Sequence, residues 1–509
     1  MKTTIRREFA KRKHHLARRL KAAREREDAG VPTLSRARVR LEIAGRVRAV
    51  GTGGVALAHQ VAVHSGLVDA IDERLHLLKF HRPYHESDHV LNIAYNVLCG
   101  GRTLEDLELL RNDEAYLDLF GTEATPDPTT AGDFCRRFDA ADIDALSDAI
   151  NEARLRVWSR QGPEFTQQTA RIDADGSFVT TSAECKEGVS LSYKGGWGYH
   201  PLVVSLANTA EPLFIVNRGG SRPSSEGAAA YLDRAVALCR RAGFTDVLLR
   251  GDTDFSQTQH LDRWTDDGVR FVFGYLAANA LKTRADGLDA DAYRELERRA
   301  KRAFVATDKR RQRPERHKEA VVVAKGYRNI KLKSEDLAEF SYRPVACTRP
   351  HRIVVVRKNL SIERGENVLF DDIRYFFYVT NDWSLSAEEV VFEANHRCDQ
   401  ENLIAQLKGG VRALHAPVNT LNANGAYMLM ASLAWTLKAW MALWLPVSPR
   451  WASRHRTDRE RWLRMDFRTF RNAVLAIPAQ VITTARQRVL RFLSWRPELL
   501  TLFRLADGL

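Results

Sequence analysis

The order of apolar segments after residue 165 constrains the fold of this chain more than any other feature. Three segments with alternating or continuous apolar residues come first: TARIDADGSFVTT, YHPLVVSLA and EPLFIVNR. The amphipathic segment EGAAAYLDRAVALCRRAGF then precedes two further apolar segments, DVLLRGD and VRFVFGYLA, which are separated by a short helical pattern at 258–266. Alternation with a period of two predicts strands, whereas apolar residues three and four apart predict helices. Three strands followed by helix, strand, helix and strand predict a mixed α/β sheet.

The segments on either side of this region have different patterns. Residues 55–153 carry apolar residues at helical spacing, and the pattern beyond residue 384 again predicts helices through an arginine-rich tail. Between them, four segments read as strands of a β-rich insertion: EAVVVAKG, EFSYRPVACT, HRIVVVRKNL and RYFFYVTND. A chain of 509 residues exceeds one typical domain. We expect four units: a basic arm with a helical region at 1–165, the first part of the sheet at 166–277, the insertion at 278–380, and the second part of the core with a C-terminal helical region at 381–509.

The charge of the chain favours a polyanionic partner. It has 78 Lys and Arg against 64 Asp and Glu, which gives a formal net charge of +14. Nucleic acid is the leading candidate for such a partner, although a basic surface can also be only solvated. The first thirty residues are especially basic, and they form either a phosphate-binding arm or a solubilising tail.

The location of the chain follows from what its sequence lacks. Its six cysteines are scattered without a CxxC pair, which suggests reduced thiols, and its basic N-terminus has no apolar signal segment. The apolar segment 426–445 has nearly the length of a membrane span, but it contains Lys438 and is closed by Pro446. Because a lysine inside a membrane is costly, we expect a buried core helix and a cytoplasmic protein.

Acidic side chains occur at three places where polar groups could meet. Asp173 and Asp175 alternate on one strand, so they point to the same face. Asp252 follows an apolar strand, and the carboxyl ends of strands are where open α/β sheets usually build sites. Glu401 lies on a helical segment that Gly409 and Gly410 end.

The helix around Glu401 also carries two cations on the same face. Arg397 lies one turn before Glu401, and Lys408 lies about two turns after it. Carboxylates from separate elements can hold two magnesium or manganese ions about 3.5–4 Å apart, while Arg and Lys bind the phosphate oxygens. The alternative is that these acids are helix caps or ion pairs.

The segment HRCDQENLIAQLKGG carries the spacing R-x3-E-x6-K at Arg397, Glu401 and Lys408. With DADGS, RGDTDF and YKGGWGYHPLVVSLANTAEPLFIVNR, it resembles the bacterial insertion-sequence transposases of the Tyr-Arg-Glu-Lys signature group. The resemblance covers roughly residues 171–440 well. It implies an RNase H-like core that a β-rich insertion interrupts before the glutamate.

The resemblance also implies roles for individual residues. The second aspartate of the acidic triad falls on Asp252 and the glutamate on Glu401, while the first aspartate falls on Asp175 with Asp173 as the competitor. These acids would bind magnesium, with manganese as an alternative, and Arg397 and Lys408 would contact DNA phosphate. The signature's tyrosine is replaced by Ala394, so an aromatic group would have to come from elsewhere, for instance Phe392 or Trp383.

We therefore expect a DNA transposase of the cut-and-paste DDE type. Water would cleave at the transposon ends, and the freed 3′-hydroxyl would attack target DNA. Because each end needs its own triad, the enzyme would be at least a homodimer on double-stranded DNA, in the bacterial cytoplasm near the nucleoid. The alternatives are a DNA nuclease on the same fold that does not join strands, and an inactive descendant that only binds DNA ends.

Overall fold

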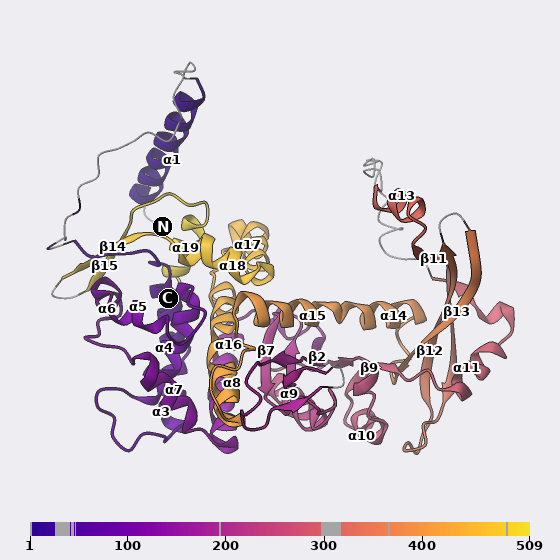
Figure 1. The fold of residues 1–509 in the computed structure, drawn as a ribbon. Coiled ribbons are helices and arrows are strands. Elements are labelled where there is room, and N and C mark those ends of the chain that lie inside the picture. The colour runs from indigo at the N-terminus through magenta and orange to yellow at the C-terminus, as the bar shows by residue number, and fades with distance from the viewer. Residues whose placement is uncertain are drawn as a thin grey trace.

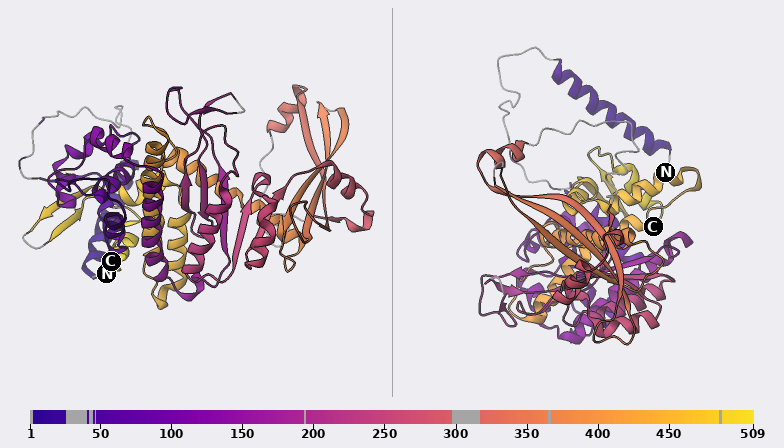
Figure 2. Two further views of the ribbon diagram at one scale, coloured as in Figure 1. Left: turned by 90° about the horizontal axis from the view of Figure 1, so that it is seen from below. Right: turned by 90° about the vertical axis from the view of Figure 1, so that its right-hand side faces the viewer.

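The computed structural model describes residues 3–25, 41, 45, 47–192, 195–296, 317–364, 367–484 and 487–509. A sheet lies at the centre, with the N-terminal helices at one end of the molecule and a long β insertion at the other (Figures 1 and 2). The mixed α/β fold with helical terminal regions agrees with the sequence prediction.

The central sheet has nine strands in the order β10-β11-β12-β13-β9-β8-β2-β6-β7. The meander of β2, β6 and β7 is antiparallel, and β2, β8 and β9 are parallel neighbours. Helix α9 connects β7 to β8, and α10 connects β8 to β9. The bounds of these elements are β2 Ala170–Gly176, β6 Leu202–Leu206, β7 Glu211–Val216, α9 Ala228–Arg241, β8 Val247–Gly251, α10 Leu261–Asp266 and β9 Arg270–Tyr275.

The first predicted strand is shorter than its apolar pattern suggested. TARIDADGSFVTT forms β2 and then leaves the main sheet after Gly176, so that Val179–Thr180 (β3) joins a small separate sheet. That sheet also contains Ser190–Leu191 (β4) and Trp197–Tyr199 (β5). The break sets Asp175 close to the carboxyl end of β2.

The insertion extends the central sheet. Strands β11, β12 and β13 form a long antiparallel ribbon, and β13 pairs with β9 of the core. Figure 1 shows this ribbon at the far side from the N-terminal helices. Its elements are α11 Asn279–Asp286, β10 Arg294–Glu295, α13 His317–Ala324, β11 Arg328–Tyr342, β12 His351–Arg364 and β13 Asn367–Thr380.

One expected strand of the insertion is wrong. EAVVVAKG is helical and forms most of α13 (His317–Ala324). A short run of β-branched residues does not distinguish a strand from a helix by itself. Of the segment EFSYRPVACT, only the first part belongs to β11, which ends at Tyr342 before Pro344.

Two consecutive helices cross one face of the sheet after the insertion (Figure 1). Helix α14 (Ala387–His396) begins at the Ser386 capping box, in which Glu389 is the reciprocal partner. Helix α15 (Cys398–Ala405) continues it and ends in a π-helical turn, Gln406–Gly410. Residues of α14 and α15 contact β2, β8 and β9, and α14 packs its apolar residues against Leu248 and Val272 on this face.

The apolar segment near residue 430 forms the central helix α16 (Leu421–Leu443), which is buried along most of its length. It packs against the N-terminal helices and β7. No helix among the described residues is long and apolar enough to cross a membrane. The helices of the N-terminal region are α2 Val55–His64, α3 Leu67–Arg74, α4 Glu86–Cys99, α5 Leu107–Arg111, α6 Glu114–Phe120, α7 Pro128–Arg136 and α8 Ala140–Ser159.

The two ends of the chain meet in three dimensions. The basic N-terminal segment forms α1 (Thr3–Arg24), whose Phe9 ring lies 6.3 Å from that of Trp495. Strand β1 (Ala49–Val50) pairs with β14, and β14 pairs with β15. We expected a helical C-terminal region, but it also contains these two strands. The elements of this region are α17 Ala452–Arg464, α18 Phe467–Phe470, β14 Ala479–Thr483, β15 Arg488–Phe492 and α19 Leu499–Ala506.

Candidate active site

Three acidic side chains from three separate elements meet where β2 and β8 end. Asp175 lies near the end of β2, Asp252 directly follows β8, and Glu401 lies on α15. Because β2 and β8 are parallel neighbours, their carboxyl ends share one edge of the sheet. Arg397 joins two of the acids: one of its terminal nitrogens lies 3.3 Å from an oxygen of Asp175, and the other lies 3.7 Å from an oxygen of Glu401.

The electrostatics of this site disfavour the ionised form of the two aspartates. Burial raises the pKa of Asp175 to about 6, and the charges of Asp252 and Glu401 add to this effect, although Arg397 opposes it. Burial also raises the pKa of Asp252, although the hydrogen bond from the Asp254 backbone N–H lowers it in part. The ionised acids therefore repel one another, and a nearby cation would relieve the repulsion.

A glycine and a short turn hold Asp252 in place. The Asp252 carboxylate accepts a hydrogen bond of 3.0 Å from the Asp254 N–H at the start of a 3₁₀ turn, Thr253–Phe255. A Cβ atom at Gly251 would lie 2.6 Å from the Cβ of Phe255, so a larger residue there would displace the turn. The close approach of this turn to β8 fixes where Asp252 points.

Asp173 lies on the same side of β2 as Asp175 but has a different partner. Arg250 donates to both of its carboxylate oxygens, at 2.7 and 2.8 Å, and the pair is almost completely buried. Arg250 also contacts Glu393 of α14 at 3.0 Å, and Glu393 binds Arg171 at 2.8 Å. Both oxygens of Asp173 are thus engaged in a network that joins β2, β8 and α14. The sequence does contain a signal for this network, because Arg250 lies inside an apolar strand and a buried arginine needs an acidic partner.

The two cations of the α15 face lie beside the acids. Lys408 donates a hydrogen bond of 2.7 Å to the Phe178 carbonyl oxygen, and burial lowers the pKa of its ammonium, although Asp175 opposes this. Lys408 sits in the π-helical turn, whereas we expected an α-helix throughout. The Glu401 side chain is 61% exposed and therefore accessible to a ligand.

The comparison with protein families decides what kind of protein this is. A family model described as transposase DDE domain group 1 matches residues 31–507. The chain belongs to this family. Membership implies an enzyme of the DDE type with a divalent-metal requirement.

Other comparisons are more distant. A cryo-EM structure of a piggyBac transposase synaptic complex with hairpin DNA aligns with 82% of this chain and 79% of that chain, at 8% sequence identity and a TM-score of 0.35. The comparison with curated proteins gives no match.

The donor set of this DDE-family chain suits a hard divalent cation. Asp175, Asp252 and Glu401 offer only carboxylate oxygens, the ligands that magnesium and manganese prefer. Two of the three carboxylates have a raised pKa because their charges are buried and adjacent. The residues therefore fit a divalent metal, whose charge would offset this crowding.

His200 lies beside this site and was not anticipated from the sequence. Its Nδ1 donates a hydrogen bond of 2.7 Å to the Arg222 carbonyl oxygen, which leaves the lone pair on Nε2. A Cβ atom built on Gly176 would lie 2.9 Å from that Nε2. No local pattern marks His200, because only the fold brings it to the end of β2.

The aromatic alternatives to Ala394 lie on two different elements. Trp383 is 63% exposed before α14, with the Arg352 guanidinium 5.7 Å from its ring. Phe392 lies on α14 and lines a cavity with Tyr378 and Asn395. Ala394 itself packs against a buried apolar cluster that includes Val390 and Val391 of α14.

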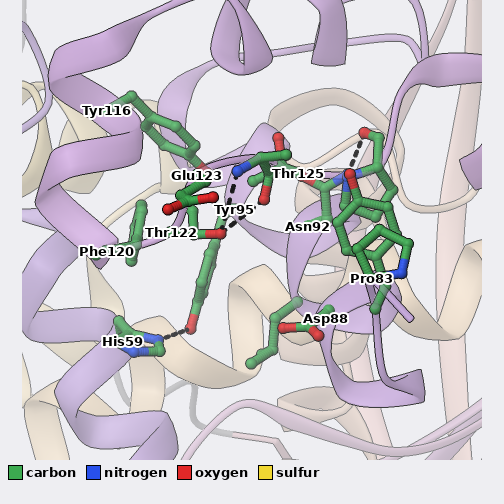
Figure 3. A pocket seen from close by; sticks show the side chains of 15 residues that line it. His59, Pro83, Asp88, Asn92, Tyr95, Tyr116, Phe120, Thr122, Glu123 and Thr125 are labelled. Atoms are coloured by element: carbon green, nitrogen blue, oxygen red, sulfur yellow. Dashed lines mark hydrogen bonds between the residues drawn. The ribbon is translucent and has the colours of Figure 1, made fainter. Parts of the chain in front are cut away.

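A separate cavity of about 500 Å³ lies among the N-terminal helices (Figure 3). Aromatic rings of Tyr95, Tyr116 and Phe120 line it, and His59 Nδ1 lies 2.8 Å from the Tyr95 hydroxyl oxygen. None of the three acids at the sheet edge lines this cavity. It is thus distinct from the candidate active site.

Proposed function

We propose that this chain is a cut-and-paste DNA transposase whose catalytic acids are Asp175, Asp252 and Glu401. The observation that carries the proposal is the meeting of these acids from β2, β8 and α15 around Arg397, in a chain of the DDE family. We prefer Asp175 to Asp173 because Arg250 occupies both oxygens of Asp173.

The proposed metal ligands are the same three acids, with magnesium as the ion and manganese as a substitute. When bound, the divalent cation supplies a Lewis acid that activates the attacking oxygen and stabilises the leaving oxygen. A bound cation would favour the ionised forms of Asp175 and Asp252, because burial raises the pKa of both carboxyl groups in its absence.

The cationic side chains position the DNA. Arg397 and Lys408 lie on either side of Glu401 along the helix and bind the non-bridging oxygens of the reacting phosphate. Water attacks the phosphodiester at the transposon end and releases a 3′-hydroxyl, which then attacks a phosphodiester of the target. The Asp173–Arg250–Glu393 network holds β2, β8 and α14 together behind the reacting groups.

The strand order supports an RNase H-like core. An antiparallel meander, β2-β6-β7, is followed by β8 and β9 parallel to β2, and the helix that carries the last acid contacts β2. We infer that this core occupies 166–277 and part of 381–509, with a β-rich insertion at 278–380 and a DNA-end-binding region at 1–165. We also assign the chain to the Tyr-Arg-Glu-Lys signature group through Arg397, Glu401 and Lys408.

The partner we propose is double-stranded DNA, both transposon end and target. A net charge of +14 and the basic helix α1 favour contacts with phosphate. Synapsis of two ends would need a homodimer, and the expected setting is the bacterial cytoplasm.

A strand-transfer assay tests the proposal. A labelled duplex that carries the element's own end is incubated with magnesium and the wild-type chain, Asp252→Ala, Glu401→Ala or the control Asp148→Ala. Asp148 is an acid of α8 that is 52% exposed and paired with Arg234. We expect cleaved and joined products from the wild type and the control, and neither product from the two site variants.

The other outcomes point to the alternatives. Cleavage without joining would indicate a nuclease on this fold. Binding of the end without either reaction would indicate a DNA-binding regulator, and activity in Asp252→Ala or Glu401→Ala would refute the assignment of the acids.

A further inference from the structure

A second cluster of metal-ligating side chains joins the insertion to the core. Asp262 lies on α10, and Cys347 and His351 lie on the connection between β11 and β12 and at the start of β12. Their ligand atoms, a carboxylate oxygen, a thiol sulfur and an imidazole nitrogen, all lie within 4.8 Å of one another. Cys347 is 6% exposed and His351 only 2%, so the cluster is mostly shielded from water.

The hydrogen bonds around the cluster orient its ligand atoms. One oxygen of Asp262 accepts hydrogen bonds from the backbone N–H and the hydroxyl of Thr348, at 2.6 and 2.7 Å. This leaves the other oxygen facing His351 Nε2, at 3.0 Å. Outer hydrogen bonds of this kind hold metal ligands in position.

The ligand types in this cluster differ from those of the acidic triad. A thiolate and an imidazole suit zinc, which is typically four-coordinate, whereas the triad offers only carboxylates. The Thr258 carbonyl oxygen lies 3.2 Å from the Cys347 sulfur, so the fourth position can be taken by this oxygen or by water.

We propose that Asp262, Cys347 and His351 form a structural zinc site that fastens the β insertion to the segment following Asp252. Thr258 and Asp262 come six and ten residues after Asp252 in the chain, so the site would anchor the segment that leads away from this acid. The zinc site is independent of the proposed transposase activity.

The charges and protons of the site balance. Burial by itself raises the pKa of Asp262, but hydrogen bonds from Thr348 and His351 together lower it to about 2, so Asp262 binds as a carboxylate. Burial raises the pKa of the Cys347 thiol to about 11, so zinc must displace its proton to solvent and break its hydrogen bond to Thr258. The Nε2 proton that His351 donates to Asp262 must also leave to solvent while Nδ1 takes one up, which frees the Nε2 lone pair for zinc. A thiolate and a carboxylate neutralise Zn²⁺. The nearby Arg349, 3.7 Å from Asp262, is paired with Asp266 at 2.5 Å.

Cobalt(II) provides a probe that separates this site from the acidic triad, because only a thiolate ligand gives an intense charge-transfer band in the near ultraviolet. The full chain, without a histidine tag, is titrated with Co²⁺ and then with Zn²⁺. The variants are Cys347→Ala and the control Cys135→Ala, a thiol that is also buried but lies on α7. We expect the band in the wild type and the control, saturating at one equivalent and displaced by zinc.

In Cys347→Ala the band should be absent, and the affinity for zinc should fall by at least about 100-fold, more than loss of an outer-shell partner causes. X-ray absorption at the zinc edge of the wild-type chain, loaded with one equivalent, supplies a measurement that needs no variant. It should show one sulfur at about 2.3 Å together with nitrogen and oxygen ligands. A wild type without the cobalt band, a band that persists in Cys347→Ala, or zinc bound only by oxygen and nitrogen would overturn the proposal.

Discussion

Asp175→Asn should stabilise the protein while removing its activity. Burial and the neighbouring acids raise the pKa of Asp175 from 3.8 to about 6, and the side chain is only 16% exposed. A shift of about two units corresponds to about 3 kcal/mol of unfavourable free energy in the ionised folded state. The neutral amide avoids this cost.

The direction of the pH dependence follows from the raised pKa. Below pH 3.8 Asp175 is protonated in both the folded and unfolded chain, so its ionisation does not affect stability. Between pH 3.8 and about 6 the folded state holds the proton that the unfolded state releases, so stability falls as the pH rises. Above about 6 the full penalty is present.

Urea denaturation in EDTA, followed by tryptophan fluorescence, measures the difference. At pH 7.5 Asp175→Asn should be more stable than the wild type by about 3 kcal/mol at most, and the difference should vanish near pH 3.5. Magnesium should stabilise the wild type but not the variant, whereas the control Asp148→Asn should respond to magnesium like the wild type. If Asp175→Asn were no more stable than the wild type at pH 7.5, the electrostatic account of the site would be refuted.

Three further predictions concern the surroundings of the site and the central helix. Asp173→Asn should lower the free energy of unfolding by roughly 3 kcal/mol in the same urea assay, because Arg250 stays buried with only Glu393 as an acidic partner; unchanged stability would contradict this. Burial lowers the pKa of Lys438 to about 7, so stability should rise with pH above 7 as the folded chain loses this proton first. Lys438→Met should therefore be more stable at pH 6, on the order of 4 kcal/mol, with a smaller gain at pH 9; a gain that grows with pH would contradict the reasoning. Lys408→Ala should weaken binding of an end duplex and reduce the salt dependence of binding, measured by fluorescence anisotropy, by about one phosphate contact; an unchanged slope would remove Lys408 from the DNA interface.

The central fold could be predicted because its elements have local patterns. The segments around Asp175 and Asp252 are apolar strands with their own periodicity, and the helix between them is amphipathic. The β1–β14 pairing was missed because it joins Ala49 to Gln480, residues far apart in a tail whose arginines hide the strand pattern. The helix α13 was mistaken for a strand because its valines favour either element.

The candidate site was only partly predictable, because some of its contacts join residues that are far apart in the sequence. The spacing of Arg397, Glu401 and Lys408 is visible along one helix, and the fold keeps them near Asp175. Alternation could not separate Asp173 from Asp175, since both point to one face of β2. The distinction depends on the Arg250 side chain of the neighbouring strand. His200 reaches the site only through tertiary packing.

Metal rescue tests the central claim most directly, since it asks whether a given side chain binds the catalytic ion. Asp252→Cys replaces a hard oxygen ligand by a softer sulfur, which magnesium binds poorly and manganese tolerates better. We predict that Asp252→Cys fails to cleave the end duplex with magnesium and regains cleavage with manganese. Asp148→Cys should cleave with both ions. Full activity of Asp252→Cys with magnesium, or equal loss of activity with both ions, would contradict the assignment of Asp252 as a metal ligand.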